Sequence, residues 1–104
     1  MLFQLTMFPS AKSAKAASSS QAVAKVIDII DKSGLPYVLG PMSTSIEGSW
    51  DKVIPVINKA RLRLRREYPR LYISITIDDR KGAKGRLTGK VASVEKRLGR
   101  RASK

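Results

Sequence analysis

The side chains available for chemistry in this 104-residue chain are carboxylates, amines, guanidinium groups, hydroxyls and phenols, because the chain contains no cysteine and no histidine. A zinc site built on those two residue types, a cysteine nucleophile and a Ser-His-Asp triad are therefore excluded within one chain. Only eight carboxylates are present, and two of them, Glu47 and Asp78, fall on strand-like segments that we expect to be adjacent. Carboxylates attract cations and accept hydrogen bonds. The sequence therefore indicates a domain that binds a partner rather than catalysing a reaction.

Four further residues are candidates for contact with a ligand, and each also has an ordinary structural interpretation. Thr44 either donates to a ligand or is a β-branched residue of a strand. Ser19 and Ser20 belong to a serine run that favours helix N-caps over ligand contacts. Trp50 either stacks on an aromatic ring or, as we favour, packs over the edge of a sheet.

The whole chain has a formal net charge of +13, and most of the positive charge lies in its second half. Residues 1–58 hold five lysines against four acids, whereas residues 59–104 hold sixteen Lys or Arg against four acids. Such asymmetry indicates either an anionic partner such as nucleic acid or a solvated helix face followed by a basic tail. The segment Lys81–Arg86 has the composition of a phosphate-binding loop without the Walker spacing, and we interpret it as a solvated loop.

Hydrophobic periodicity in the first half predicts three strands and one helix. Apolar and polar residues alternate from Phe3 to Phe8, which predicts a strand ended by Pro9. A loop over residues 10–20 leads into a helix with an apolar face of Val23, Val26, Ile27 and Ile30, and Gly34 is placed to terminate it. Two further strands are predicted, over 36–40 and 44–47.

The second half predicts two helices and the clearest strand of the chain. One helix begins at Trp50 or Asp51 and buries Val53, Ile57, Ala60 and Leu64, and Pro55 is tolerated if it falls in or just beyond the first turn. Strict alternation from Leu71 to Asp78 predicts a strand. A last helical stripe of Leu87, Val91, Val94 and Leu98 precedes a basic tail at 99–104.

The order β-α-β-β-α-β predicts an α+β, ferredoxin-like fold with an added C-terminal helix, in one domain over residues 1–98. Helices would cover one sheet face, and the other would present Gln4, Thr6, Tyr72, Ser74, Thr76 and Glu47. Because this open face and the sheet edges need cover, we expect a homo-oligomer. No apolar run approaches the length of a membrane span, and the first residues lack the basic start of a signal peptide. We therefore expect a cytoplasmic location.

Several segments taken together resemble the small thiamine-binding proteins of the YkoF-like superfamily. They are Leu5–Pro9, Gly40–Gly48, Trp50-Asp51, Ile75–Arg80 and Lys90–Glu95, in one register over residues 1–98. The resemblance implies a ferredoxin-like fold, dimers that pair into tetramers, and binding of thiamine or its pyrimidine part without turnover. Two departures affect the expected pocket: the loop after Pro9 lacks a Gly-Thr pair, and Ala22 replaces an aromatic residue.

Thiamine joins a cationic thiazolium ring to an aminopyrimidine, and a carboxylate suits both parts. Glu47, followed by Asp78, is therefore the acid that we expect to select such a ligand, with Thr44, Ser19, Ser20 and Trp50 as further contacts. Both acids also have an ordinary structural interpretation: Glu47 as a strand-end carboxylate in water or paired with a lysine, and Asp78 as part of a turn with Asp79 and Arg80. No cofactor and no metal are expected. The alternative function is weak nucleic-acid binding by the basic half, although the aromatic signature of RNA-binding sheets is absent. An enzyme is the least favoured interpretation.

Overall fold

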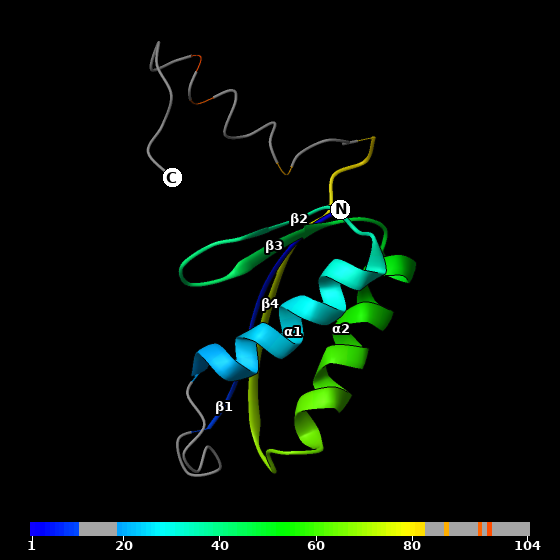
Figure 1. The fold of residues 1–104 in the computed structure, drawn as a ribbon. Helices are drawn as coiled ribbons and strands as arrows, with labels where there is room; N and C mark the ends of the chain where they lie inside the picture. The colour runs from blue at the N-terminus through cyan, green and yellow to red at the C-terminus, as the bar shows by residue number, and fades with distance from the viewer. Residues whose placement is uncertain (11–18, 83–86, 88–93, 95, 97–104) are drawn as a thin grey trace.

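The computed structural model describes residues 1–10, 19–82, 87, 94 and 96. Its elements are, in chain order, β1 (Leu2–Pro9), α1 (Ser19–Ser33), β2 (Tyr37–Leu39), β3 (Thr44–Glu47), α2 (Trp50–Arg65) and β4 (Leu71–Asp78) (Figure 1). This order confirms the predicted α+β, ferredoxin-like fold. The predicted C-terminal helix and the basic tail lie outside the described residues, except that Leu87, Val94 and Lys96 have helical backbone.

The four strands form one antiparallel sheet in the order β2-β3-β1-β4. Strand β1 therefore lies between β3 and β4, and the expectation that the segments of Glu47 and Asp78 are adjacent is wrong. Both residues are instead paired with Leu2, one on each side of it. Two strand spacings of about 4.8 Å each separate their backbones.

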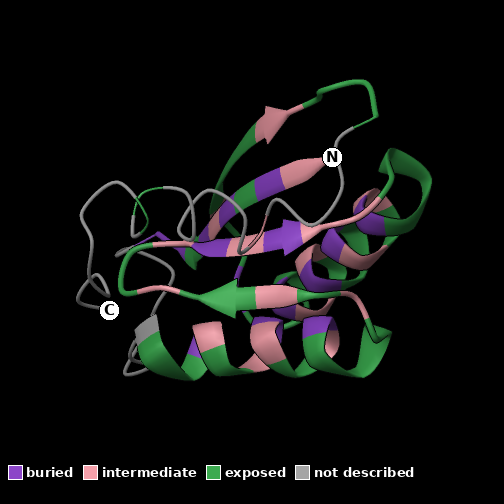
Figure 2. Ribbon diagram, turned by 90° about the horizontal axis from the view of Figure 1, so that it is seen from above, coloured by how far each residue is buried: buried purple, intermediate pink, exposed green. Residues whose placement is uncertain are grey.

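The strand register decides which side chains share a sheet face, because directly paired residues point the same way. Phe3, Leu5 and Met7 are buried against the helices, and their partners on β4 are Ile77, Ile75 and Ile73. Buried residues consequently alternate with more exposed ones along β1 and β3 (Figure 2). The opposite, open face carries the residues that the alternation predicted, which are Gln4, Thr6, Tyr72, Ser74, Thr76 and Glu47. Phe8, which was not predicted there, lies on the same face beside Tyr72.

Helix α1 begins earlier and faces the sheet slightly differently than predicted. Ser19 and Ser20 are its first two residues rather than part of the preceding loop, and it ends before Gly34, whose φ of 78° is accessible to glycine. The buried stripe is Ala22, Val26 and Ile30, whereas Val23 and Ile27 are only half-buried. The residues that meet the sheet are spaced four apart along the helix. The buried face of α1 is therefore rotated by about one residue from the predicted face.

Helix α2 matches its prediction closely. Ser49 is the N-cap residue, and the buried side chains are Val53, Ile57, Ala60 and Leu64. Pro55 is the sixth helical residue, so its missing N–H removes one hydrogen bond, to the carbonyl of Asp51 in the first turn. Both helices pack side by side on the same sheet face (Figure 1), which closes the core around Phe3, Ile46 and Leu64.

Candidate functional site

A pocket of about 220 Å³ lies beside Thr44, the first residue of β3, where β1 extends beyond its pairing with β3. The pairing of β1 with β3 ends at Leu5 and Thr44, whereas its pairing with β4 runs on to Pro9. The β2–β3 loop and helix α1 enclose the resulting gap. We call this the ring pocket, and it is lined by Leu5, Thr6, Met7, Phe8, Val23, Val26, Leu39, Gly40, Pro41, Met42, Ser43 and Thr44. Since a cavity of about 150 Å³ holds benzene, the ring pocket has room for one substituted six-membered ring.

Side chains from β1 hold the loop that forms one wall of the ring pocket. Gln4 Nε2 donates to Ser43 Oγ at 3.0 Å, and Thr6 Oγ1 donates to the Met42 carbonyl at 3.3 Å. The turn is closed by the Gly40 N–H, which donates to the Ser43 carbonyl at 2.8 Å. A Cβ at Gly40 would approach that same carbonyl oxygen to 3.0 Å, so glycine suits this position sterically. The wall is therefore set before a ligand arrives.

Thr44 places a buried hydroxyl at the wall of the ring pocket. Its side chain points to the helix-covered side of the sheet, and the residue is only 5% exposed. Within the described part of the chain its hydroxyl makes no hydrogen bond. Buried hydroxyls are normally paired, and leaving one unpaired costs about 1–3 kcal/mol. A ligand that hydrogen-bonds to Thr44 would recover that free energy.

A second, shallower hollow adjoins the ring pocket and contains two carboxylates. We call it the acidic hollow, and it is lined by Ser20, Val23, Ala24, Ile27, Asp28, Asp31, Tyr37 and Leu39. Val23 and Leu39 line both spaces, so the two are neighbours. The Tyr37 hydroxyl donates to Asp31 Oδ1 at 2.9 Å. This hydrogen bond, together with burial and the negative charge of Asp31, raises the pKa of Tyr37 above its ordinary value.

The six predicted site residues fall into two groups. Thr44 lines the ring pocket and Ser20 the acidic hollow, and Ser19 is the helical residue before Ser20. Glu47 and Asp78 lie at the other end of the sheet, on its open face, with Leu2 between them.

Glu47 and Trp50 therefore belong to surroundings that differ from the ring pocket. Glu47 Oε1 accepts a hydrogen bond from the Leu87 N–H at 3.3 Å. Trp50 is the first residue of α2, beyond the Glu47 end of β3, and its side chain is half-exposed. The structure does not bring these two residues to Thr44.

The sequence interpretation missed Thr6, Ser43 and Asp31 as candidates. A length difference could have located the gap, because β1 spans eight residues and β3 only four. An eight-residue strand next to a four-residue strand must leave part of one edge unpaired. Asp28 and Asp31 are three residues apart on one helix, which places them on one face. No sequence signal marked the packing of that face beside β2.

Metal and membrane signals are both negative within the described part of the chain. Residues 1–10 and 19–82 contain no grouping of three or more acidic side chains that could hold a metal ion. In the same residues neither helix has the length and apolar character needed to cross a bilayer.

Known proteins with similar folds agree with this architecture. A hypothetical protein of Methanocaldococcus jannascii aligns with a TM-score of 0.78 and 25% identity, covering 89% of this chain and 93% of the other. A candidate thiamine biosynthesis or salvage protein of Thermotoga maritima aligns with a TM-score of 0.77 over 89% of this chain and 96% of the other. Because its identity is 18%, this second likeness shows the fold alone.

Sequence relatives are closer in identity. A UPF0045 protein of Mycobacterium bovis is 36% identical over 79 residues, which covers 75% of this chain and 78% of the relative. The UPF0045 protein of Mycobacterium tuberculosis has the same identity and coverage. A family model described as thiamine-binding protein matches residues 3–95, a span that includes all the described strands and helices except Leu2, the first residue of β1. The chain therefore belongs to the thiamine-binding protein family.

Proposed function

We propose that this protein binds thiamine, or the pyrimidine part of thiamine, in the cytoplasm and without converting it chemically. The observation that carries the proposal is the buried, unpartnered hydroxyl of Thr44 within the described part of the chain, at the wall of a ring-sized pocket. Membership of the thiamine-binding protein family supports the choice of ligand class.

An aminopyrimidine ring matches the ring pocket in size and polarity. The aliphatic walls of Leu5, Val26 and Leu39 suit the faces of a flat ring, and the sulfurs of Met7 and Met42 make favourable contacts with aromatic rings. The ring nitrogens and the exocyclic amine offer both acceptors and donors. The Thr44 hydroxyl can therefore hydrogen-bond to the ring either as a donor or as an acceptor.

The cationic thiazolium ring would then occupy the acidic hollow. Thiamine's two rings are joined by a single carbon, and the two spaces adjoin at Val23 and Leu39. The Asp31 carboxylate lies there and accepts a hydrogen bond from the Tyr37 hydroxyl. A carboxylate beside a cation lowers the free energy of the bound state, and partial exposure limits the gain to about 0.2–1 kcal/mol.

Calorimetric titration with thiamine, with its hydroxymethylpyrimidine part and with its thiazole part tests the proposal. We expect thiamine to bind most tightly, the pyrimidine part next, and the isolated thiazole weakly or not at all. A short RNA is the fourth arm, because the basic half suggests nucleic acid. Failure of both thiamine and the pyrimidine part to bind, or tight RNA binding at physiological salt, would contradict the proposed function.

A matched pair of substitutions locates the ligand. Val23→Phe adds a ring at the junction of the two spaces and should weaken thiamine binding by tenfold or more. Val38→Phe makes the same change on an exposed side chain of β2 that lines neither space. We expect Val38→Phe to leave the affinity unchanged, with melting curves confirming that both variants fold.

We also propose that the protein works as a homo-oligomer, a dimer or tetramer, through the outer edge of β4. This edge strand has eight residues, and the stretch Leu71–Ile77 contains no charge, proline or glycine. Ile73 and Ile75 remain 38% and 37% exposed on it. Monomeric proteins usually protect such an edge.

Light scattering measures the oligomer directly and should give a mass above the 11.5 kDa of one chain. Ile75→Lys should lower that mass, because a charge on an edge strand opposes its pairing with a strand of another copy. The control, Val38→Lys, lies on the opposite edge of the sheet and should not lower it. A monomeric mass for the unmodified protein would contradict oligomer formation without bearing on thiamine binding.

A further inference from the structure

A long groove runs between the outer surfaces of α1 and α2, on the side of the helices that faces away from the sheet. Its volume is about 1000 Å³, and none of its described lining residues also lines the ring pocket. We call it the basic groove, and it is lined by Gln21, Ala24, Lys25, Asp28, Ile29, Lys32, Lys59, Leu62, Arg63 and Arg66. Five cations and one acid give this lining a formal charge of +4.

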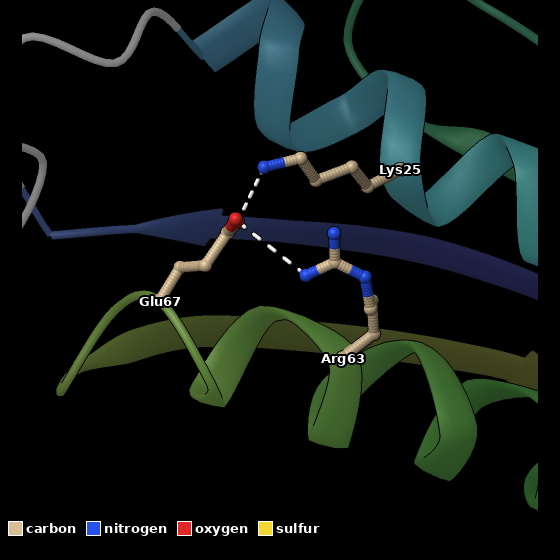
Figure 3. Close-up of polar contacts among 3 residues, drawn as sticks. All are labelled: Lys25, Arg63 and Glu67. Carbon is tan, nitrogen blue, oxygen red and sulfur yellow. Dashed lines mark hydrogen bonds and ion pairs between the residues drawn. The ribbon is translucent and has the colours of Figure 1, made fainter.

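Charge in the basic groove is only partly compensated within the protein. Glu67 pairs with Lys25 and also with Arg63, whose Nη1 lies 3.5 Å from Glu67 Oε2 (Figure 3). Lys32 pairs with Asp28 at 2.9 Å. In the described residues, Lys59 and Arg66 have no acidic partner. The groove therefore offers positive charge to a partner.

The spacing of these residues repeats on the two helices. Lys25, Ile29 and Lys32 follow one another at intervals of four and three residues on α1. Lys59, Leu62 and Arg66 follow at three and four on α2. Each helix thus presents an aliphatic side chain between two cations, over about 10 Å of its length. Leu62 is 50% exposed, so it is available for an apolar contact.

The charge of the groove narrows the class of occupant. A second copy of the chain would bring an identical basic groove to an isologous contact, so like charges would meet. Residues 83–104 carry eight Lys or Arg against one Glu and would be repelled in the same way. A nucleic-acid backbone would satisfy the cations but would place charged phosphates against Leu62 and Ile29.

We propose that the basic groove is a docking site for an acidic amphipathic helix of another protein. Such a helix carries apolar residues at intervals of three and four, with Glu or Asp beside them, and so complements both rows of the groove. Its apolar side chains would cover Leu62 and Ile29, and its carboxylates would meet Lys59 and Arg66. Helices laid into a groove between two others are a common mode of peptide recognition.

A fluorescent synthetic peptide of about 18 residues, long enough to be partly helical alone, tests the proposal. It carries leucine at helical intervals of three and four and glutamate at the flanking positions. A scrambled peptide of the same composition, and a single-stranded oligouridylate, are the comparison probes. Fluorescence anisotropy should show the patterned peptide binding at least tenfold more tightly than the scrambled one.

Substitutions in the full-length protein separate the apolar contact from general charge attraction. Leu62→Ser should weaken binding of the patterned peptide by about tenfold, and Lys59→Glu combined with Arg66→Glu should weaken it further. Lys52→Glu is the matched control, because this exposed lysine of α2 lies outside the groove. It should change binding by less than about twofold. All these side chains are exposed, so the variants should fold, which melting curves check.

Three results would overturn the proposal. Equal affinity for the patterned and scrambled peptides would show that the groove attracts anionic peptides without recognising a helical pattern. Tighter binding of oligouridylate than of the patterned peptide would assign the groove to nucleic acid. No binding of the patterned peptide at about 100 µM would exclude an acidic helix of this pattern, since even weak specific contacts have dissociation constants in that range.

Discussion

The ring pocket and the basic groove lie on opposite sides of α1 and differ most in charge. Among the described residues, no charged side chain lines the ring pocket, and the lining of the hollow beside it includes two acids and no cation. Six of the ten residues that line the basic groove are charged, five of them positively. The described lining of the proposed thiamine site is therefore not positive, although the chain has a net charge of +13. The net charge describes the field far from a protein, whereas the local side chains decide what a pocket accepts.

Salt should separate the two regions by the largest margin. Raising the salt concentration from 50 to 300 mM shortens the Debye length from about 14 Å to about 6 Å. We expect the patterned acidic peptide to lose about tenfold or more in affinity for the basic groove, and thiamine to lose less than about twofold. Anisotropy and calorimetry measure the two affinities. A thiamine affinity as sensitive to salt as that of the peptide would place the vitamin in the groove.

Neutralising one acid tests the role of the acidic hollow. Asp31→Asn retains an acceptor for the Tyr37 hydroxyl but removes the charge, so we expect thiamine to bind about two- to fivefold more weakly. The uncharged hydroxymethylpyrimidine should be unaffected. Asp51→Asn, in the first turn of α2, is the control that should leave both affinities unchanged. An equal loss for both ligands would show that Asp31 supports the pocket structurally and does not face the cation.

The ion pair between Lys25 of α1 and Glu67, in the turn after α2, should give the smallest effect, through pH. The hydrogen bond from Lys25 lowers the pKa of Glu67. The ion pair therefore contributes fully to the stability of the folded protein above the ordinary glutamate pKa of about 4.3. This contribution is lost as the pH falls through the lowered pKa of Glu67 in the folded state. Glu67→Gln should be slightly less stable than the parent at pH 7 and equally stable near pH 2. Urea unfolding at both pH values would refute this if the difference stayed constant.

The sequence was sufficient for the elements and the order of the fold because each signal was local. The strand predicted over Leu71–Asp78 and the buried helical stripe from Val53 to Leu64 are both present in the structure, although burial does not alternate along that strand. The face of α1 was harder to predict, since several aliphatic side chains compete for burial. Only the packing against the sheet selected Ala22 over Val23.

The candidate site depended on contacts between distant segments, and the sequence predicted less of it. Thr44 and Glu47 are three residues apart on one strand, so their side chains point to opposite faces. Treating them as one ligand set overlooked that parity. The edge position of β4 could not be deduced from local pattern either. It was that position that separated Asp78 from Glu47 by a whole strand.

Calorimetric titration of thiamine into Thr44→Val and Glu47→Gln, with urea unfolding of both variants, tests the central claim most directly. Valine keeps the shape of threonine but removes the buried hydroxyl. Thr44→Val should therefore bind thiamine about two- to tenfold more weakly, while its ligand-free stability stays equal or rises. Glu47→Gln should bind thiamine as the parent does. Unchanged affinity in Thr44→Val together with weakened affinity in Glu47→Gln would contradict the assignment and move the ligand to the open face of the sheet.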